Sequence, residues 1–181
     1  MRRKVCKWFW AWEFEKEEEW LNGMAAKGLA LTSVGYCKYE FEDSLPGEYT
    51  VRLEMLNNWP SHAESQRYIQ FIEETGAEQV GSIMRWVYFR KKKTDGEFTL
   101  FSDTDSRIAH LNRVLALLTP LTVMNIWIGI YNIVLRFTIH APTINLLSGI
   151  VSELVSLLLL CGILRIWKVR RKLKKERLLR E

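Results

Sequence analysis

The chain has 181 residues, of which 26 are Lys or Arg and 21 are Asp or Glu, giving a formal net charge of +5. Residues 165–181 carry nine basic and two acidic residues, so the preceding part of the chain is close to neutral. Because nucleic-acid-binding domains concentrate basic charge on a folded face, this distribution argues against direct nucleic-acid binding and fits a tail on anionic lipid. The three cysteines, Cys6, Cys37 and Cys161, have no metal-site or disulfide-framework spacing and indicate a reducing compartment.

The N-terminus begins basic and then apolar, as a secretory signal does, but a glutamate-rich segment stands where a cleavage site would be. We therefore expect these residues to belong to the mature protein. Residues 4–12 (KVCKWFWAW) are rich in aromatic residues and predict a strand. Residues 13–28 predict a helix, because apolar side chains recur at helical spacing, glutamates occupy the first turns and Gly28 supplies a stop.

Residues 29–42 predict a second strand, which a turn at residues 44–47 ends. Residues 48–56 alternate between apolar and polar residues, the pattern of a half-buried strand. A second helix is expected from Ser61, which forms a capping box with Glu64, to Gly76, and residues 78–92 predict the last strand. The order β-α-β-β-α-β is the ferredoxin-like arrangement, so residues 1–100 are predicted to form an α+β cytosolic domain.

A ferredoxin-like sheet leaves one face open, and the predicted strands carry aromatic residues on both faces. Large exposed apolar surfaces usually mark contact sites, although a domain dimer or the membrane segment would cover the same face. RNA-binding domains of this fold stack bases there, but residues 48–56 lack their signature. We predict a partner-binding surface made of Trp8, Trp10, Trp12, Trp86 and Tyr88.

Residues 101–113 are predicted to form a juxtamembrane helix. Asp103 and Asp105 raise the alternative of a metal site, but no suitable spacing supplies further ligands. Ser102 or Asp103 is the expected N-cap, with Asp105 near the positive end of the helix dipole. Such a helix would transmit movement between the domain and the membrane.

Two long apolar segments follow. Residues 114–135 carry no formal charge, and Glu153 is the only charged residue in 141–164. Each segment is long enough to span a bilayer, although a core helix of a soluble protein is the alternative. We predict transmembrane helices at 114–135 and 143–166, an external loop at 136–142 and a basic cytosolic tail at 167–181.

The positive-inside rule places both termini in the cytoplasm, so the sequence predicts a multi-pass protein of the cell membrane. Basic residues of the tail are expected to contact lipid head groups: Arg170, Arg171, Lys172, Lys174 and Lys175.

A hairpin centred on residue 139 sets Asn125 at the depth of Glu153, and Gly129 at that of Gly149. Small and polar residues mediate helix packing in membranes, so we predict an intramembrane polar contact among Asn125, Asn132, Ser152 and Glu153. An ionisable group in a membrane is a functional hypothesis by default. Glu153 is therefore either a packing or oligomer contact, or a proton-linked or ligand-sensing group.

No nucleophile elbow, phosphate-binding glycine loop or paired His/Glu metal motif occurs in the sequence. Catalytic triads do assemble from distant positions, but nothing here marks one. The sequence therefore predicts a protein that is not an enzyme, without a cofactor or a metal.

Four segments carry a resemblance to a known family: FWAWEFEKEEEWLNGMAAKGLALTSVGYCKYEFED, PGEYTVRLEML, YIQFIEETGAEQVGSIMRWVYFRKK and DGEFTLFSDTDSRIAHLNR. Together they resemble the bacterial domain-of-unknown-function family 2812 from about residue 8 to 113. The resemblance implies a cytosolic domain followed by membrane spans, often encoded beside PadR-type transcriptional regulators. It implies no catalytic residues, and because the membrane part varies among members it says nothing of Glu153.

Two functional hypotheses follow. The first is a membrane-anchored, non-catalytic interaction or signal-sensing protein whose aromatic domain binds a protein partner, for which a PadR-type regulator is the first candidate. The second is an accessory subunit of a membrane transporter or efflux complex, in which Glu153 would act on protons or substrate. Membrane lipid is a partner in both, and a homo-oligomer is compatible with both.

Overall fold

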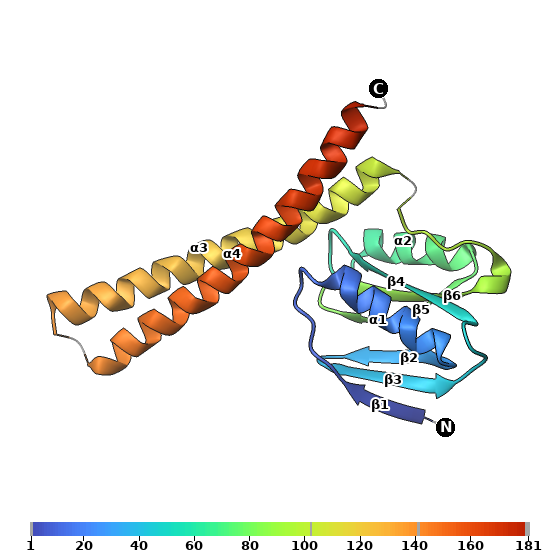
Figure 1. Ribbon diagram of the computed structural model, residues 1–181, viewed down its shortest axis with the longest axis horizontal. Coiled ribbons are helices and arrows are strands. Elements are labelled where there is room, and N and C mark those ends of the chain that lie inside the picture. The colour runs from blue at the N-terminus through green and yellow to red at the C-terminus, as the bar shows by residue number, and fades with distance from the viewer. Residues whose placement is uncertain (1, 102, 141, 180–181) are drawn as a thin grey trace. The chain divides into compact units, whose positions relative to one another are not determined.

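The computed structural model describes residues 2–101, 103–140 and 142–179, and the chain divides into two compact units, Met1–His110 and Leu111–Glu181. The described residues of the N-terminal unit form six strands and two complete helices, with a short 3₁₀ turn at Lys93–Asp95 and the start of a third, longer helix (Figure 1). In chain order these elements are β1 (Arg2–Cys6), α1 (Phe14–Ala26), β2 (Leu29–Gly35), β3 (Lys38–Asp43), β4 (Tyr49–Met55), α2 (Ala63–Glu74), β5 (Ala77–Ile83) and β6 (Trp86–Lys92).

The predicted α+β class is confirmed, but the strands number six and form two three-stranded antiparallel sheets, ordered β1-β3-β2 and β4-β6-β5. The predicted ferredoxin-like arrangement had a single strand at residues 29–42 and another at 78–92. In the structure each of these segments forms a β-hairpin of two strands. The chain reverses at Cys37 and at Met84, both of which have positive φ angles. Residues other than glycine seldom take that conformation, so the sequence lacks the usual turn signal at either place.

The strand predicted at 4–12 ends at Cys6. Strand β1 pairs with β3 from Arg2 opposite Glu42 to Cys6 opposite Lys38, which is the first residue of β3. The N–H of Lys7 still donates to the carbonyl of Cys37 (3.2 Å), in the turn before β3, and the chain then leaves the sheet. The cap predicted at Ser61 lies at His62, whose ring Nδ1 accepts the N–H of Glu64, while Gly28 and Gly76 end the helices as expected with φ angles of 79° and 88°.

The N-terminal unit is an internal repeat, because β1-α1-β2-β3 and β4-α2-β5-β6 have the same strand order within their sheets. The two copies share local details as well. A register shift falls between Leu31 and Ser33 in β2, and another falls between Gln79 and Gly81 in β5, 48 residues further on. The same interval separates the helix-ending residues Gly28 and Gly76. We infer that one β-α-β-β supersecondary unit occurs twice.

The two copies meet along β2 and β5, and the backbones approach closely there. A Cβ atom at Gly81 would lie 2.9 Å from Val34 Cγ2 and 3.6 Å from the backbone nitrogen of Val34, so this place favours glycine. Arg90 of β6 ties the sheets together, donating to the carbonyl of Leu31 (2.9 Å) and to the carboxylate of Glu42 (3.2 Å).

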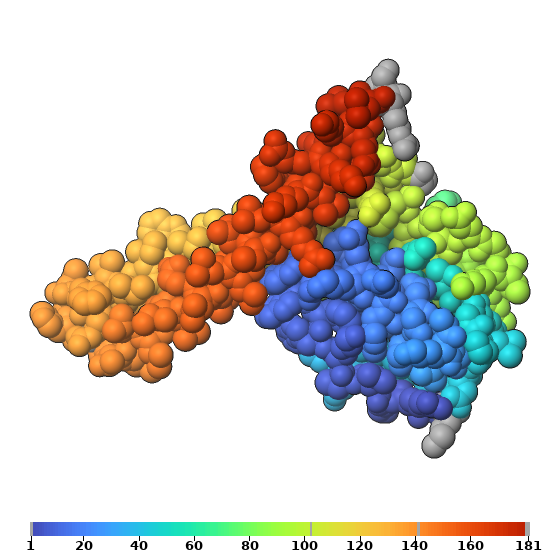
Figure 2. Space-filling view, in the orientation of Figure 1, coloured from blue at the N-terminus to red at the C-terminus, as the bar shows by residue number. Residues whose placement is uncertain are grey.

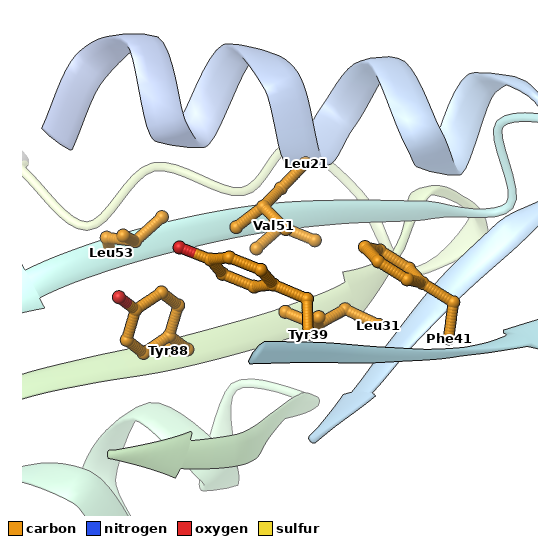
Figure 3. Close-up of a cluster of buried hydrophobic side chains, with 7 residues drawn as sticks. All are labelled: Leu21, Leu31, Tyr39, Phe41, Val51, Leu53 and Tyr88. Atoms are coloured by element: carbon orange, nitrogen blue, oxygen red, sulfur yellow. The ribbon is translucent and has the colours of Figure 1, made fainter. Parts of the chain in front are cut away.

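Helix α1 lies between the two sheets, whereas α2 covers the opposite face of the second sheet (Figure 1). The larger core cluster therefore draws on α1 and on both repeats (Figure 3). Its buried members are Leu21, Leu31, Tyr39, Phe41, Val51, Leu53 and Tyr88. The second cluster packs α2 against the second sheet through Leu56, Ile69, Ile72, Ala77, Val87, Phe89 and Phe98.

Two helices longer than the predicted spans follow: α3 (Thr104–Thr138) and α4 (Thr143–Leu178). The C-terminal unit contains α4 and the part of α3 after His110. The juxtamembrane helix and first span are thus one helix, which contains Pro120, and the second span continues through most of the basic tail. Both helices are long and apolar enough to cross a membrane, and most of their apolar side chains are exposed. Figure 2 draws the surfaces of α3, in yellow to orange, and α4, in orange to red.

Candidate functional site

The polar centre of the N-terminal unit is Glu17 on α1, which is only 7% exposed. Its Oε1 atom accepts two hydrogen bonds, one from the hydroxyl of Tyr39 on β3 and one from that of Tyr88 on β6, both at 2.7 Å. The hydroxyls approach from different sheets and point toward the same side of the core cluster (Figure 3). We call Glu17, Tyr39 and Tyr88 the Glu17 site.

Burial governs the protonation of this site. Desolvation raises the pKa of Glu17 above its ordinary value of 4.5, and the two tyrosine hydrogen bonds only partly oppose that rise. Burial and the adjacent carboxyl also raise the pKa of Tyr39 and of Tyr88. Both phenols therefore stay neutral and remain hydrogen-bond donors.

An aromatic pair lies outside the Glu17 site. The ring of Trp20 is 5.0 Å from that of Tyr39 and 5.6 Å from that of Phe9. The ammonium of Lys7 rests over both outer rings, 4.6 Å from the centroid of Trp20 and 4.9 Å from that of Phe9. Two aromatic faces around one ammonium form a cation–π contact.

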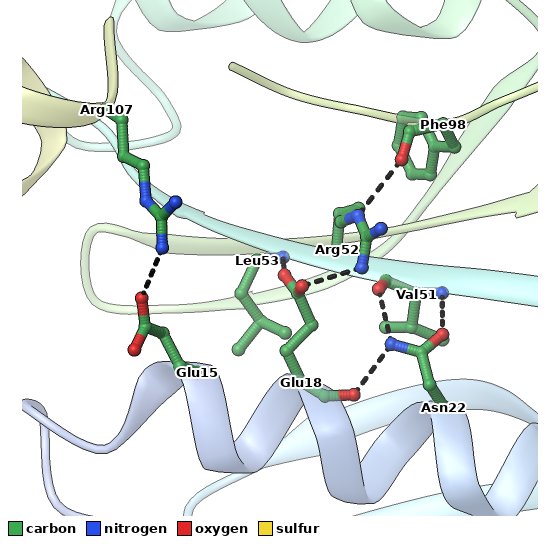
Figure 4. Close-up of polar contacts among 8 residues, drawn as sticks. All are labelled: Glu15, Glu18, Asn22, Val51, Arg52, Leu53, Phe98 and Arg107. Atoms are coloured by element: carbon green, nitrogen blue, oxygen red, sulfur yellow. Dashed lines mark hydrogen bonds and ion pairs between the residues drawn. The ribbon is translucent and has the colours of Figure 1, made fainter. Parts of the chain in front are cut away.

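Side chains cover the outer edge of β4. Asn22 accepts the N–H of Val51 (2.9 Å) and donates to its carbonyl (3.0 Å), while Glu18 accepts the N–H of Leu53 (3.1 Å) (Figure 4). The N–H of Met55 donates to Nδ1 of His110 at 3.4 Å. An exposed strand edge would pair with other chains, and these contacts close it.

His110 lies in the first turns of α3 and joins that helix to the N-terminal unit. Its ring is 1% exposed and packs against Phe14 (4.8 Å), Phe101 (5.0 Å) and Trp86 (5.5 Å). Arg107, one turn earlier, pairs with Glu15 of α1 at 2.9 Å (Figure 4). The start of α3 is therefore held by the same helix, α1, that carries Glu17.

The predicted cap at the start of α3 is confirmed at Asp103. Its carboxylate accepts the N–H of Ser106 (2.7 Å), and these hydrogen bonds hold the pKa of Asp103 below its usual range. Ser102, the alternative cap, lies outside the described residues. Within residues 2–101, 103–140 and 142–179, no group of three or more His, Cys, Asp or Glu side chains is placed to hold a metal ion.

The structure separates the residues predicted as one aromatic partner surface. Tyr88 is buried at the Glu17 site, and Trp86 packs beside His110. The other three lie in the irregular segment after β1, where Trp8 meets Trp10 edge-on (5.3 Å) and Trp10 stacks on Trp12 (5.1 Å). Trp8 (60%) and Trp10 (37%) are exposed and Trp12 is partly buried. These three residues, which we call the tryptophan cluster, are the part of the predicted surface that reaches solvent.

In the C-terminal unit α3 and α4 meet at glycines. A Cβ atom at Gly149 would lie 3.0 Å from the carbonyl oxygen of Gly129, which agrees with the predicted pairing of these residues. A Cβ atom at Gly129 would overlap the carboxyl of Glu153. Glu153 thus packs onto the glycine of the facing helix, and its Oε1 atom is buried without a hydrogen-bond partner among the described residues.

The predicted polar residues of the hairpin have separate partners. Asn125 donates to the carbonyl of Leu121 on its own helix (3.0 Å) rather than to Glu153. Asn132 accepts from Asn145 across the helices (3.3 Å), a contact the prediction did not include. Ser152 accepts a hydrogen bond through its carbonyl from Ser156 (2.9 Å).

The basic residues predicted to contact lipid lie on the last turns of α4. Arg171, Lys172, Lys174 and Lys175 are exposed, whereas Arg170 is partly buried. The guanidinium of Arg171 stacks over the ring of Trp167 at 4.4 Å. A tryptophan followed by exposed cations is typical of the boundary between the hydrocarbon core and the head groups of a membrane. The arrangement is compatible with the predicted contact between these cations and lipid head groups.

We expect Glu17→Gln to change how stability depends on pH. A carboxyl group whose pKa is higher in the folded than in the unfolded state lowers the free energy of unfolding once it ionises. This loss is absent below the unfolded-state pKa of about 4.5 and is complete above the folded-state pKa. The wild type should therefore lose stability relative to Glu17→Gln as the pH rises from about 4.5 through the folded pKa. Pulse proteolysis of the full chain in detergent micelles across a urea series measures this difference. A difference that does not vary with pH would contradict the raised pKa.

We expect Gly129→Leu to separate the hairpin helices, because Gly129 contacts both Glu153 and Gly149. Disulfide formation between Asn132→Cys and Asn145→Cys, whose side chains touch in the wild type, reports the packing. Crosslinking should fall sharply in the Gly129→Leu background. Ile130→Leu, on the exposed side of α3, is the matched control and should crosslink as the wild type does.

Sequence reasoning did not find the Glu17 site. Glu17 is one of several glutamates in the run EKEEE, and the run itself gives no sign of which one is buried. The available signal was spacing: Glu17 comes three residues after Phe14 and four before Leu21, so it lies on the apolar face of α1. Tyr39 and Tyr88 were expected on strands, but their meeting depends on the way the two sheets pack.

Comparison with known proteins gives one result. The family model described as "Protein of unknown function (DUF2812)" matches residues 13–123, which run from the start of α1 into the apolar part of α3. Neither the curated proteins nor the solved structures gave a match. Because the matched segment covers more than half of the chain, the protein belongs to the DUF2812 family.

Proposed function

We propose that this protein is a membrane-anchored, non-catalytic signal-sensing protein, in which α3 links a cytosolic sensing unit to a membrane hairpin. The observation that carries the proposal is the continuity of α3 (Thr104–Thr138). Its first turns belong to the N-terminal unit through Arg107 and His110, and its later turns form the apolar hairpin with α4.

Surface chemistry supports the membrane anchor. Many large apolar side chains of both helices are exposed, among them Trp127 (70%), Leu147 (57%) and Leu154 (61%). A soluble core helix would bury such residues, and lipid is the environment that accommodates them. By the positive-inside rule, the exposed cations after Trp167 support a cytoplasmic C-terminus for α4, and a hairpin would return the N-terminal unit to the same side.

The contacts of α1 would couple the Glu17 site to the start of α3. This helix carries Glu17, and it also carries Glu15 and Phe14, which contact Arg107 and His110 of α3. A signal that shifts α1 would therefore change the contacts at the start of α3. Only a signal with different affinity for two arrangements of these elements can shift their populations.

The two arrangements of α1 and α3 would differ in how well the tryptophan cluster binds a protein partner. Trp8 and Trp10 are exposed next to α1, and clustered exposed tryptophans are typical of binding hot spots. We take the partner to be a transcriptional regulator, held at the membrane in one state and released in the other.

The test is crosslinking in intact cells followed by affinity purification from membranes and mass spectrometry. Wild type is compared with Trp8→Ala/Trp10→Ala and with Trp59→Ala, an equally exposed tryptophan elsewhere in the N-terminal unit. We expect a cytosolic regulator with wild type and Trp59→Ala, and its loss from the double variant. Recovery of the protein in the soluble fraction would overturn the anchor. Recovery of transport proteins alone would favour an accessory transporter subunit, for which the buried Oε1 of Glu153 is the supporting observation.

A further inference from the structure

The carboxyl group of Glu17 is buried in the N-terminal unit. Among the residues that the structure describes, its side chain receives two tyrosine hydrogen bonds and forms no ion pair. The neighbouring Glu18, in contrast, pairs with Arg52 at 2.7 Å. An isolated buried carboxylate is costly, and such groups cluster at functional sites. A positively charged ligand would compensate the ionised form of this carboxyl group.

Glu17 lies at the junction of the two β-α-β-β copies. Glu17 and Tyr39 come from the first β-α-β-β copy and Tyr88 comes from the second, so the three groups meet at the junction of the repeats. Ligand sites occur preferentially at junctions between structural units, with few polar groups set among apolar and aromatic ones. The surroundings here are the aromatic and aliphatic side chains of the larger core cluster.

A cation already rests on the outer aromatic pair. The ammonium of Lys7 lies over Trp20 and Phe9, and Trp20 packs in turn on the ring of Tyr39. Lys7 is exposed and begins the irregular segment that leads to α1. It can therefore leave the pair by side-chain rotation alone, without breaking a strand or a helix.

From these observations we propose that the Glu17 site binds a hydrophobic organic cation, an amine or quaternary ammonium carried on an aromatic body, and that Lys7 occupies the outer pair in its absence. The ligand's positive charge compensates the Glu17 carboxylate. Trp20 and Phe9 provide cation–π faces, and the hydroxyls of Tyr39 and Tyr88 hold the carboxylate in place. The inference rests on the proposed sensing role and names the chemical class of its signal.

The test uses the full chain in nanodiscs of zwitterionic lipid, with benzyltrimethylammonium as the probe and isothermal titration calorimetry as the readout. Benzyl alcohol, which has the same ring without the charge, is the control ligand. We expect the wild type to bind the cation and not the alcohol. Glu17→Gln should weaken binding about tenfold or more, because it removes the compensating charge.

Lys7→Ala distinguishes this site from general binding to aromatic surface. Removing the tethered competitor should strengthen binding several-fold, whereas Lys27→Ala, the same change at the exposed end of α1, should leave it unaltered. If Glu17→Gln does not fold, Trp20→Leu serves instead, because Trp20 is only partly buried, with Trp59→Leu as its control.

Three outcomes would overturn the inference: no binding by either wild type or Lys7→Ala, equal binding of benzyl alcohol, or unchanged affinity in Glu17→Gln and Trp20→Leu. Each is separable from failure of the proposed function. A chain that inserts into nanodiscs without binding the probe refutes the ligand alone. A chain that binds the probe in detergent micelles but does not insert into nanodiscs refutes the membrane anchor alone.

Discussion

Phe41→Ala should lower the free energy of unfolding of the N-terminal unit by about 3–5 kcal/mol, the range found for removal of a buried phenylalanine ring. Phe41 lies on β3, is 0% exposed and belongs to the cluster that packs α1 against both sheets. The cavity would open beside Trp20, whose ring is 5.9 Å away. Pulse proteolysis of the full chain in micelles across a urea series measures the change.

Phe71→Ala is the matched control for this experiment. It makes the same change on α2, but Phe71 is 60% exposed, so the free energy of unfolding should move by about 0.5 kcal/mol or less. Equal losses in the two variants would mean that Phe41 does not lie in a packed core. A large loss only in Phe41→Ala would support the arrangement of α1 between two sheets.

Asn22→Leu should destabilise the unit by about 2–4 kcal/mol, because it leaves both backbone groups of Val51 without their partner. Leucine has nearly the same shape, so the loss reports the hydrogen bonds and not the packing. The amide of Asn22 makes contacts of 2.9 and 3.0 Å with Val51. The opened edge of β4 should also promote self-association, which light scattering of the same samples would detect.

Asn58→Leu provides the comparison for Asn22. Asn58 donates to Glu64 at 2.9 Å in an exposed contact, and loss of such a contact costs little. Asn22→Leu could instead lower the free energy of unfolding no more than Asn58→Leu does, without forming larger species. That result would mean that water hydrogen-bonds the backbone groups at the edge of β4 as well as the Asn22 side chain does.

Much of this fold could be predicted from the pattern of apolar residues. Strand β4 buries Val51, Leu53 and Met55 on one face as expected, although Glu54 of the other face is buried as well. Both helices end at the predicted glycines. The pairing of Gly129 with Gly149 followed from the centre of the hairpin alone. These features are local, or depend on one turn, so sequence spacing determines them.

The features that escaped prediction depend on contacts between distant segments. The turns at Cys37 and Met84 use left-handed backbone on residues that rarely adopt it, so two hairpins looked like two long strands. Tyr88 looked like part of an open face because the position of α1 between the sheets has no signature in the sequence of β6. Glu17 took its role from Tyr39 and Tyr88, which are 22 and 71 residues away.

The repeat also bears on how many ligands one chain can hold. At the interval of 48 residues that relates the two copies, the counterpart of Glu17 is Ser65, a buried hydroxyl on α2 that contacts the carbonyl of Asn58. A dimer of identical β-α-β-β chains would place the same acid on both sides of its symmetry axis. Joining the copies in one polypeptide lets them differ, and here only the first keeps the acid. The expected stoichiometry is therefore one organic cation per chain.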